Sequence, residues 1–227
     1  EVAAYWDEKD YPPPEYEFTE EEITLKLSGL SRSLRIAWVS DLHMITDHEP
    51  GEGVIAEQLY AVKARYEDLP VTSREKLHAE DLWDDVVAFL NYGRFDGVVF
   101  GGDMIDYCSA SNVERLKEGM EKLDPRIKRL YLRADHDYGS WYGGMKFPEA
   151  RAKELQAEID GDKLEDKRLV FGPEDKPELV IIGVNNSTLN MTDEQLEQLM
   201  GWVDEAREKE VSLISCTHVP YASMTDS

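Results

Sequence analysis

The chain is poor in cysteine, in basic residues and in long apolar stretches, and each shortage excludes a class of protein. Two cysteines, Cys108 and Cys216, cannot build a disulfide framework, and neither belongs to a metal-type Cys-x-x-Cys pair. Only 25 Lys and Arg stand against 48 Asp and Glu, so the formal charge is -23. Such a chain repels polyanions, which argues against a nucleic acid or an anionic membrane surface as partner. No apolar run approaches the ~18 residues that span a bilayer.

The length and the composition predict one domain preceded by an acidic lead-in. The 227 residues are enough for a single sizeable core, and they contain no internal repeat. Residues 1–22 combine many acidic side chains with three consecutive prolines, which is typical of a solvated, partly extended segment. We therefore divide the chain into a lead-in, 1–22, and one domain, 23–227.

Short apolar runs alternate with helical patterns along the domain, which predicts an α/β fold. The runs predicted as strands are 22–27, 35–40, 96–103, 128–133, 168–171, 178–184 and 211–215. The first of these alternates apolar and polar residues, and with the turn at Gly29 it predicts an edge hairpin. The excursion at 44–72 is predicted to be either a lid over the site or surface padding.

Helix signals lie between these runs. The predicted helices are 73–91 with Ser73 as its cap, Ser109 or Ser111 to Leu123, 148–159, and a helix to Lys209 that begins with the capping box of Thr192 and Gln195. The first helix is expected to bury Leu77, Leu82, Val86, Phe89 and Leu90 on one face.

Metal-ligand residue types follow several predicted strands. They are Asp41 and His43, Asp103, Asp135 and His136, and His218. Open α/β sheets bind ligands beyond the carboxyl ends of their strands, so these side chains are expected to meet. If the extended conformation continues to His43, Asp41 and His43 lie on one side of the backbone. Three of the five histidines fall in these clusters, which scattered surface histidines would not be expected to do.

The mixed set of carboxylates and imidazoles suits Mn, Fe or Zn better than a thiolate-seeking metal. A carboxylate that bridges two ions, with ligands on either side, is what a two-metal site requires. The sequence therefore predicts two divalent or mixed-valence ions.

Four motifs resemble the first four motifs of the calcineurin-like metallophosphoesterases, in that family's order. They are Asp41-x-His43, Gly102-Asp103-x-x-Asp106, Asp135-His136-Asp137 and His218-x-Pro220, and the resemblance covers residues 35–220. It implies a two-sheet β-sandwich flanked by helices, with the metal site at the carboxyl ends of the strands. It also implies that a small phosphorylated substrate, a monoester or a diester, is hydrolysed.

The resemblance assigns a role to each residue. Asp41 and His43 would hold the first metal, Asp103 would bridge, and Asp135 with His218 would hold the second. A hydroxide that bridges the metals would attack phosphorus. His136 would donate a hydrogen bond or proton near the leaving oxygen, oriented by Asp106.

Two departures from the family pattern support an alternative. The third motif of the family carries Asn where this chain has Asp135, which adds a negative charge beside an anionic substrate. The fifth motif, Gly-His-x-His, is absent, so the chain is expected either to lack the C-terminal part of the domain or to hold an incomplete site. The alternative is a catalytically impaired metal-binding module.

Several residues outside the four motifs also need an interpretation, and the aromatic ones have two. Tyr138, Trp141 and Tyr142 either form a wall for the organic part of the substrate or fix their own loop. Turn chemistry is sufficient to explain Asn185 and Asn186. His48 and His78 are expected to be surface or structural residues. The lead-in and hairpin resemble the membrane-anchored bacterial branch of the family, which implies a membrane-anchored or extracytoplasmic protein.

Overall fold

The computed structural model describes residues 10–46, 77–138, 157, 167–173, 175–186 and 191–219. Several predictions lie outside these residues: most of the 44–72 excursion, His48, the loop of Trp141 and Tyr142, and nearly all of the 148–159 helix.

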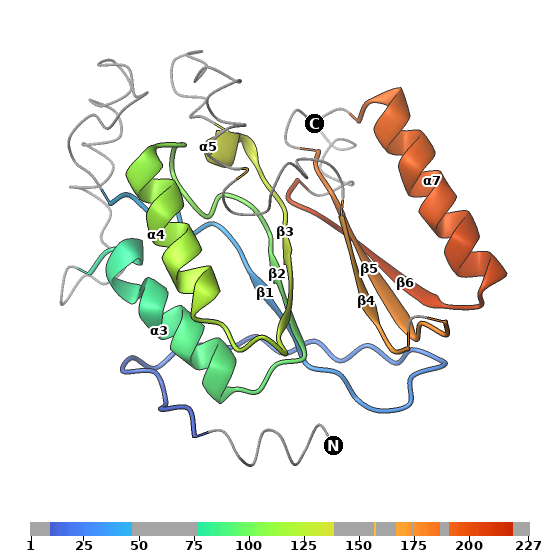
Figure 1. The fold of residues 1–227 in the computed structure, drawn as a ribbon, viewed down its shortest axis with the longest axis horizontal. Helices are drawn as coiled ribbons and strands as arrows, with labels where there is room; N and C mark the ends of the chain where they lie inside the picture. Colours follow the sequence, from blue (N-terminus) through green and yellow to red (C-terminus); the bar gives the residue numbers. More distant parts are fainter. Residues whose placement is uncertain are drawn as a thin grey trace.

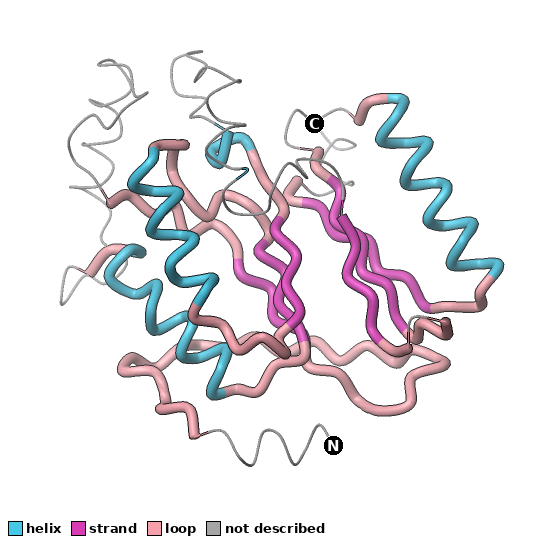
Figure 2. Tube along the Cα trace, viewed as in Figure 1, coloured by secondary structure: helices cyan, strands magenta, loops and turns pink. Residues whose placement is uncertain are grey.

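Two three-stranded sheets pack face to face (Figure 1, Figure 2). The first is parallel and has the order β1-β2-β3, with β1 at Ile36–Val39, β2 at Gly97–Phe100 and β3 at Lys128–Tyr131. The second has the order β4-β5-β6, with β4 at Lys167–Phe171, β5 at Leu179–Val184 and β6 at Ser212–Thr217. β5 is antiparallel to β4 and parallel to β6.

Helices cover the outer faces of the two sheets. In Figure 1, α3 (Ala79–Tyr92) and α4 (Ala110–Glu121) lie against the first sheet, and α7 (Asp193–Glu208) lies against the second. α5 (Asp135–Tyr138) is a single turn that follows β3. The predicted α/β fold, a two-sheet sandwich flanked by helices, is confirmed.

The period of two along the strands explains these layers. In β2, Val98 and Phe100 point into the core beneath α3 and α4, whereas Val99 points into the core between the sheets. In β5, Ile181 joins the core between the sheets and Ile182 faces α7. Strands buried on both faces read as continuous apolar runs, which is why the sequence predicted them well.

The predicted edge hairpin is wrong. Residues 22–27 form no strand, and Ile23 and Leu25 are 76% and 58% exposed. Only the turn at Gly29, with φ of 86°, is as predicted. The alternation was misleading because a strand also needs a neighbouring strand and an apolar surface to cover.

The start of α3 also differs from the prediction. The helix begins at Ala79 rather than near Ser73, because the Asp81 carboxylate accepts the His78 N–H at 2.9 Å and makes His78 the N-cap. The buried face also differs in part: Val86 and Leu90 are buried as predicted, but Trp83 and Val87 are buried too, whereas Leu82 is only half-buried. Of the two starts predicted for the next helix, Ser109 is the N-cap of α4, and the start of α7 at the Thr192–Gln195 capping box is confirmed.

The lead-in is less solvated than its composition predicts. Tyr11 and Phe18 pack against the core beneath α3 and α4, where the Phe18 and Phe89 rings lie 5.3 Å apart. The Tyr11 hydroxyl donates to the Asp124 carboxylate. The Asp85 carboxylate also accepts the Glu15 and Tyr16 N–H groups, so residues 10–18 are fixed to the domain by packing and by hydrogen bonds. Among the described helices, none has the length and apolarity needed to cross a membrane.

Candidate metal centre

The loops after β1 and β2 run side by side beyond the sheet. Asp41 N–H donates to Gly102 O at 3.0 Å, and His43 N–H donates to Asp103 O at 2.9 Å. The condition set for Asp41 and His43 is not met, because β1 ends at Val39 and the extended conformation does not continue to His43. The loop from β1 instead follows the loop from β2 through these hydrogen bonds, which bring Asp41, His43 and Asp103 together.

These loops are conformationally strained. Asp41, His43 and Asp103 have φ of 58°, 48° and 52°, a left-handed conformation that costs a non-glycine residue roughly 1–2 kcal/mol. Only two other non-glycine residues in the described part of the chain, Arg94 and Glu210, share it. Backbone strain that the fold tolerates at three neighbouring polar residues points to a functional constraint there.

Two imidazoles are oriented toward the same carboxylate. His43 Nδ1 lies 2.9 Å from Asp106 Oδ1, while its Nε2 lies 3.7 Å from Asp103 Oδ2. His218 Nδ1 lies 2.9 Å from Gly101 O, while its Nε2 lies 3.3 Å from Asp103 Oδ2. A histidine whose one ring nitrogen is held by an acceptor, with the other turned to a shared site, is the arrangement typical of metal ligands.

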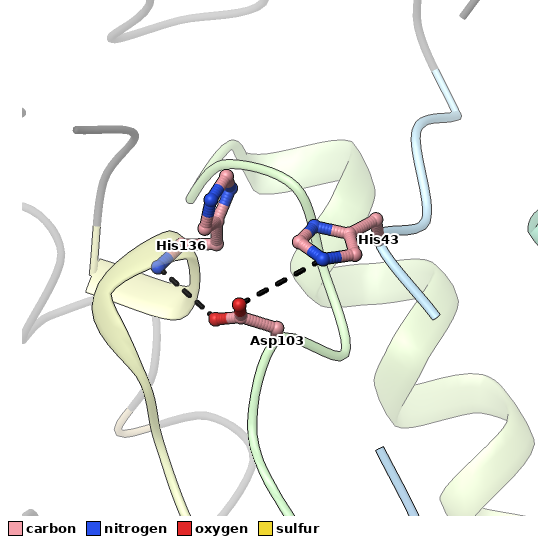
Figure 3. A group of neighbouring side chains, drawn as sticks. All are labelled: His43, Asp103 and His136. Atoms are coloured by element: carbon pink, nitrogen blue, oxygen red, sulfur yellow. Dashed lines mark hydrogen bonds and ion pairs between the residues drawn. The ribbon is translucent and has the colours of Figure 1, made fainter. Parts of the chain in front are cut away.

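The ligand-type atoms form two groups that share Asp103. His43, Asp103 and His136 form one group, and Asp41, Asp103 and His218 form the other; the ligand atoms of each lie within 4.8 Å of one another. Figure 3 shows His43 and His136 on either side of the Asp103 carboxylate. This donor set of carboxylate oxygens and imidazole nitrogens fits Mn, Fe or Zn.

The grouping differs from the roles that the resemblance implies. Asp41 and His43, expected on one metal, belong to different groups, and His136, expected as an acid, lies among ligand-type atoms. Asp135 belongs to neither group. Asp106, expected to orient His136, has Oδ1 3.1 Å from His136 Nδ1. The individual roles of these residues stay predictions.

The clustered charges shift the pKa values of the site. Burial alone would raise the pKa of Asp103, but the hydrogen bond from His218 and the neighbouring histidines outweigh it and lower that pKa. Burial alone would lower the pKa of His136, but the hydrogen bond to Asp106 and the charges of Asp103 and Asp106 raise it to about 9. The hydrogen bond to Asp103 raises the pKa of His218 to about 9 against the opposing effect of burial.

Asp137 is a residue of the site to which sequence reasoning gave no role. Its buried carboxylate accepts the backbone N–H groups of Asp103, Met104 and Ile105 at 2.9–3.3 Å and that of Ala134 at 2.8 Å. Burial raises the pKa of Asp137 to about 6 despite these donors. Its position directly after Asp135 and His136 was the available signal, but only the fold shows that it holds the Asp103 loop.

No family model matches the chain, and no curated protein matches it. Among solved structures, a dimetal phosphatase from Danio rerio is similar over 82% of this chain and 70% of that chain, with 13% sequence identity and a TM-score of 0.48.

Proposed function

We propose that this chain is a metal-dependent hydrolase of phosphate esters, either monoesters or diesters, that uses two metal ions. The observation that carries the proposal is the sharing of Asp103 by two groups of ligand-type side chains. The strained loops and the oriented rings of His43 and His218 support it.

The proposed metal ligands are Asp41, His43, Asp103 and His218, and the resemblance adds Asp135. Two ions bound there would neutralise phosphate oxygens and lower the pKa of water toward neutrality. The chain's own charge makes such cations necessary. Asp41, Asp103 and Asp106 gather in one place on a chain of net charge -23, and by themselves they would repel a phosphate.

His136 is proposed as the group that protonates the leaving oxygen. Its Nδ1 is held by Asp106 at two points, 3.1 Å from Oδ1 and 3.0 Å from the backbone O. In the metal-free chain the raised pKa of about 9 keeps this imidazole protonated at neutral pH. A positioned acid of this kind accelerates ester cleavage roughly 10²–10⁴-fold.

The alternative is a metal-binding module that does not turn over substrate. The observation that favours it is Asp135, an acidic residue next to the site that belongs to neither ligand group. Replacement of this acid by a neutral amide removes one negative charge beside the proposed phosphate site. Asp135→Asn should therefore improve phosphate binding if Asp135 faces that site.

The test combines metal analysis with a chromogenic phosphate-ester assay. The metal-free chain is loaded with Mn²⁺, Zn²⁺ or Fe²⁺ and then measured for bound metal and for release of the aryl alcohol, alongside the Asp135→Asn variant. We expect about two ions per chain and metal-dependent hydrolysis. Two ions without hydrolysis in either protein would favour the binding module, and no bound metal would contradict both functions.

A further inference from the structure

Asn186 lies where the ladder between β5 and β6 ends. The last paired residues of these parallel strands are Val184 and Thr217, so Asn186 is level with Val219, two residues beyond the sheet on each chain segment. His218 is the residue between Thr217, the last residue of β6, and Val219. A side chain that extends from Asn186 to the backbone of Val219 can fix the segment that carries the His218 ring.

The Asn186 side chain makes this connection at both of its ends. Its Nδ2 donates to Val219 O at 2.6 Å, and its Oδ1 accepts the Val219 N–H at 3.1 Å. The side-chain amide thus replaces a peptide group and continues the ladder beyond the strands. Asn186 is 7% exposed, so water has little access to compete for these hydrogen bonds.

The backbone beside Asn186 is itself anchored to α7. Gln195 Nε2 donates to Asn185 O at 2.8 Å. The same Gln195 side chain closes the capping box, accepting the Thr192 N–H at 3.0 Å. A continuous set of hydrogen bonds therefore connects the first turn of α7 with Asn186, Val219 and the segment that carries His218.

The His218 ring has little room to move. A methyl group added at Gly102 would lie 2.9 Å from His218 Nδ1, which shows how closely the ring packs against the Asp103 loop. Gly102, with φ of 99°, leaves this space open. A small displacement of the backbone at Val219 would therefore change the contacts of His218 with Gly101 O and Asp103.

From these contacts we infer that Asn186 is a positioning residue for the metal site: it holds His218 in the orientation needed to ligate a metal. This inference rests on the proposed function. It replaces the prediction that turn chemistry explains Asn186. Partners that orient a ligating histidine typically contribute about 10–100-fold to metal affinity.

The chain offers a matched control in Asn91. This asparagine is also buried, donates to Lys122 O at 3.0 Å and accepts the Asp124 N–H at 2.8 Å. It makes the same two-ended contact between segments that are distant in sequence, but it joins the end of α3 to the end of α4. Asn91→Ala should lower stability as Asn186→Ala does, without touching the proposed ligands.

The experiment measures Mn²⁺ binding by titration calorimetry in the full chain, together with denaturation of the metal-free proteins. We expect Asn186→Ala to weaken one of two binding events about 10–100-fold, while Asn91→Ala changes neither event more than about 3-fold. Asn186→Asp keeps the acceptor for the Val219 N–H and the size of the side chain, so it tests the same contact if the alanine variant does not fold. It should also weaken that event, because a carboxylate cannot donate to Val219 O.

Unchanged Mn²⁺ affinity in both Asn186 variants would overturn this inference and leave the proposed function intact. An equal loss in Asn91→Ala would also overturn it, because the effect would then be general destabilisation. A wild-type chain that binds no Mn²⁺, Zn²⁺ or Fe²⁺ would overturn the inference together with the proposed function.

Discussion

At the scale of single residues, Asp103 is the side chain on which both ligand groups depend. It belongs to each group, whereas Asp41 belongs to one. Asp103→Ala should therefore lose more bound metal than Asp41→Ala, since a bridging carboxylate serves two ions. Metal content per folded chain, measured by elemental analysis after gel filtration, checks this. Equal and undiminished metal in both variants would remove the two-metal model.

His136 is the residue whose proposed role the structure makes most testable. As an acid, it should leave metal content unchanged when replaced by alanine and lower turnover roughly 10²–10⁴-fold. The loss should shrink for esters with good leaving groups, because these depart without a proton. His136 also lies in one ligand group with His43 and Asp103, so it could instead be a metal ligand. If His136→Ala loses one metal ion, His136 is a ligand and not the acid.

The raised pKa values of His136 and His218 predict how the metal-free protein responds to pH. Both pKa values rise from 6.5 in the unfolded chain to about 9 in the folded one, so protonation stabilises the fold below pH 6.5. That stability should fall as pH increases from 6.5 to 9. Over the same range Mn²⁺ should bind more tightly, because an imidazole must lose its proton to become a ligand.

Titrations of Mn²⁺ at pH 6.5, 7.5 and 8.5, paired with urea denaturation of the metal-free chain, measure both trends. His218→Ala should flatten each of them. A wild-type affinity that is constant across this range would show that His218 does not lose a proton to become a ligand.

At the scale of elements, the carboxyl ends of β2 and β3 are joined by Asp137. Removal of its carboxylate would leave four backbone N–H groups without their acceptor, at about 1–3 kcal/mol for each group that stays buried. Asp137→Ala should therefore lower the free energy of unfolding by roughly 3 kcal/mol or more. Asp137→Asn keeps one oxygen acceptor and should cost less.

Urea denaturation measures this loss, with Asp204→Ala as the control. Asp204 lies on the exposed side of α7 and pairs only with Arg207 among the partners that the described structure gives it. Its replacement should change stability by no more than about 0.5 kcal/mol. If the two variants lose the same stability, Asp137 does not hold the Asp103 loop in solution.

At the scale of the whole molecule, metal binding is coupled to the stability of the fold. The chain carries a charge of -23, and its ligand-type carboxylates converge at one end of the sandwich. A metal present at 100 times its dissociation constant stabilises the fold by about 2.7 kcal/mol, which corresponds to roughly 5–10 °C in Tm for a domain of this size. A chelator should therefore lower Tm by this amount, and Zn²⁺ or Mn²⁺ should restore it.

Differential scanning calorimetry with and without chelator measures the shift. Asp103→Ala is the control, because chelation should change its Tm far less than that of the wild type. A wild-type Tm that does not respond to chelator would mean that metal does not bind the folded chain under those conditions.

The residue patterns by themselves determined the α/β class and most strands, whereas the two-sheet sandwich was implied by the family resemblance. Strands such as β2 and β5 are buried on both faces, so their apolar runs identify them without knowledge of their neighbours. Parallel strands bring their carboxyl ends to one edge of a sheet, so Asp41 and Asp103, which follow β1 and β2, could be predicted to meet. His218 follows β6 of the second sheet, and only the packing of the two sheets brings it to Asp103. The capping box of α7 could also be predicted from the sequence, because its two residues are only three positions apart.

Only the tertiary structure decided how the side chains are shared within the site. The left-handed backbone at Asp41 and His43 depends on hydrogen bonds to a loop about 60 residues away, so no pattern near them predicts it. Asn186 meets Val219 only because β5 and β6 pair in one particular register. These contacts depend on which segments pack together, and the physical reason is that a hydrogen bond between distant segments forms only after the core has fixed their distance and direction.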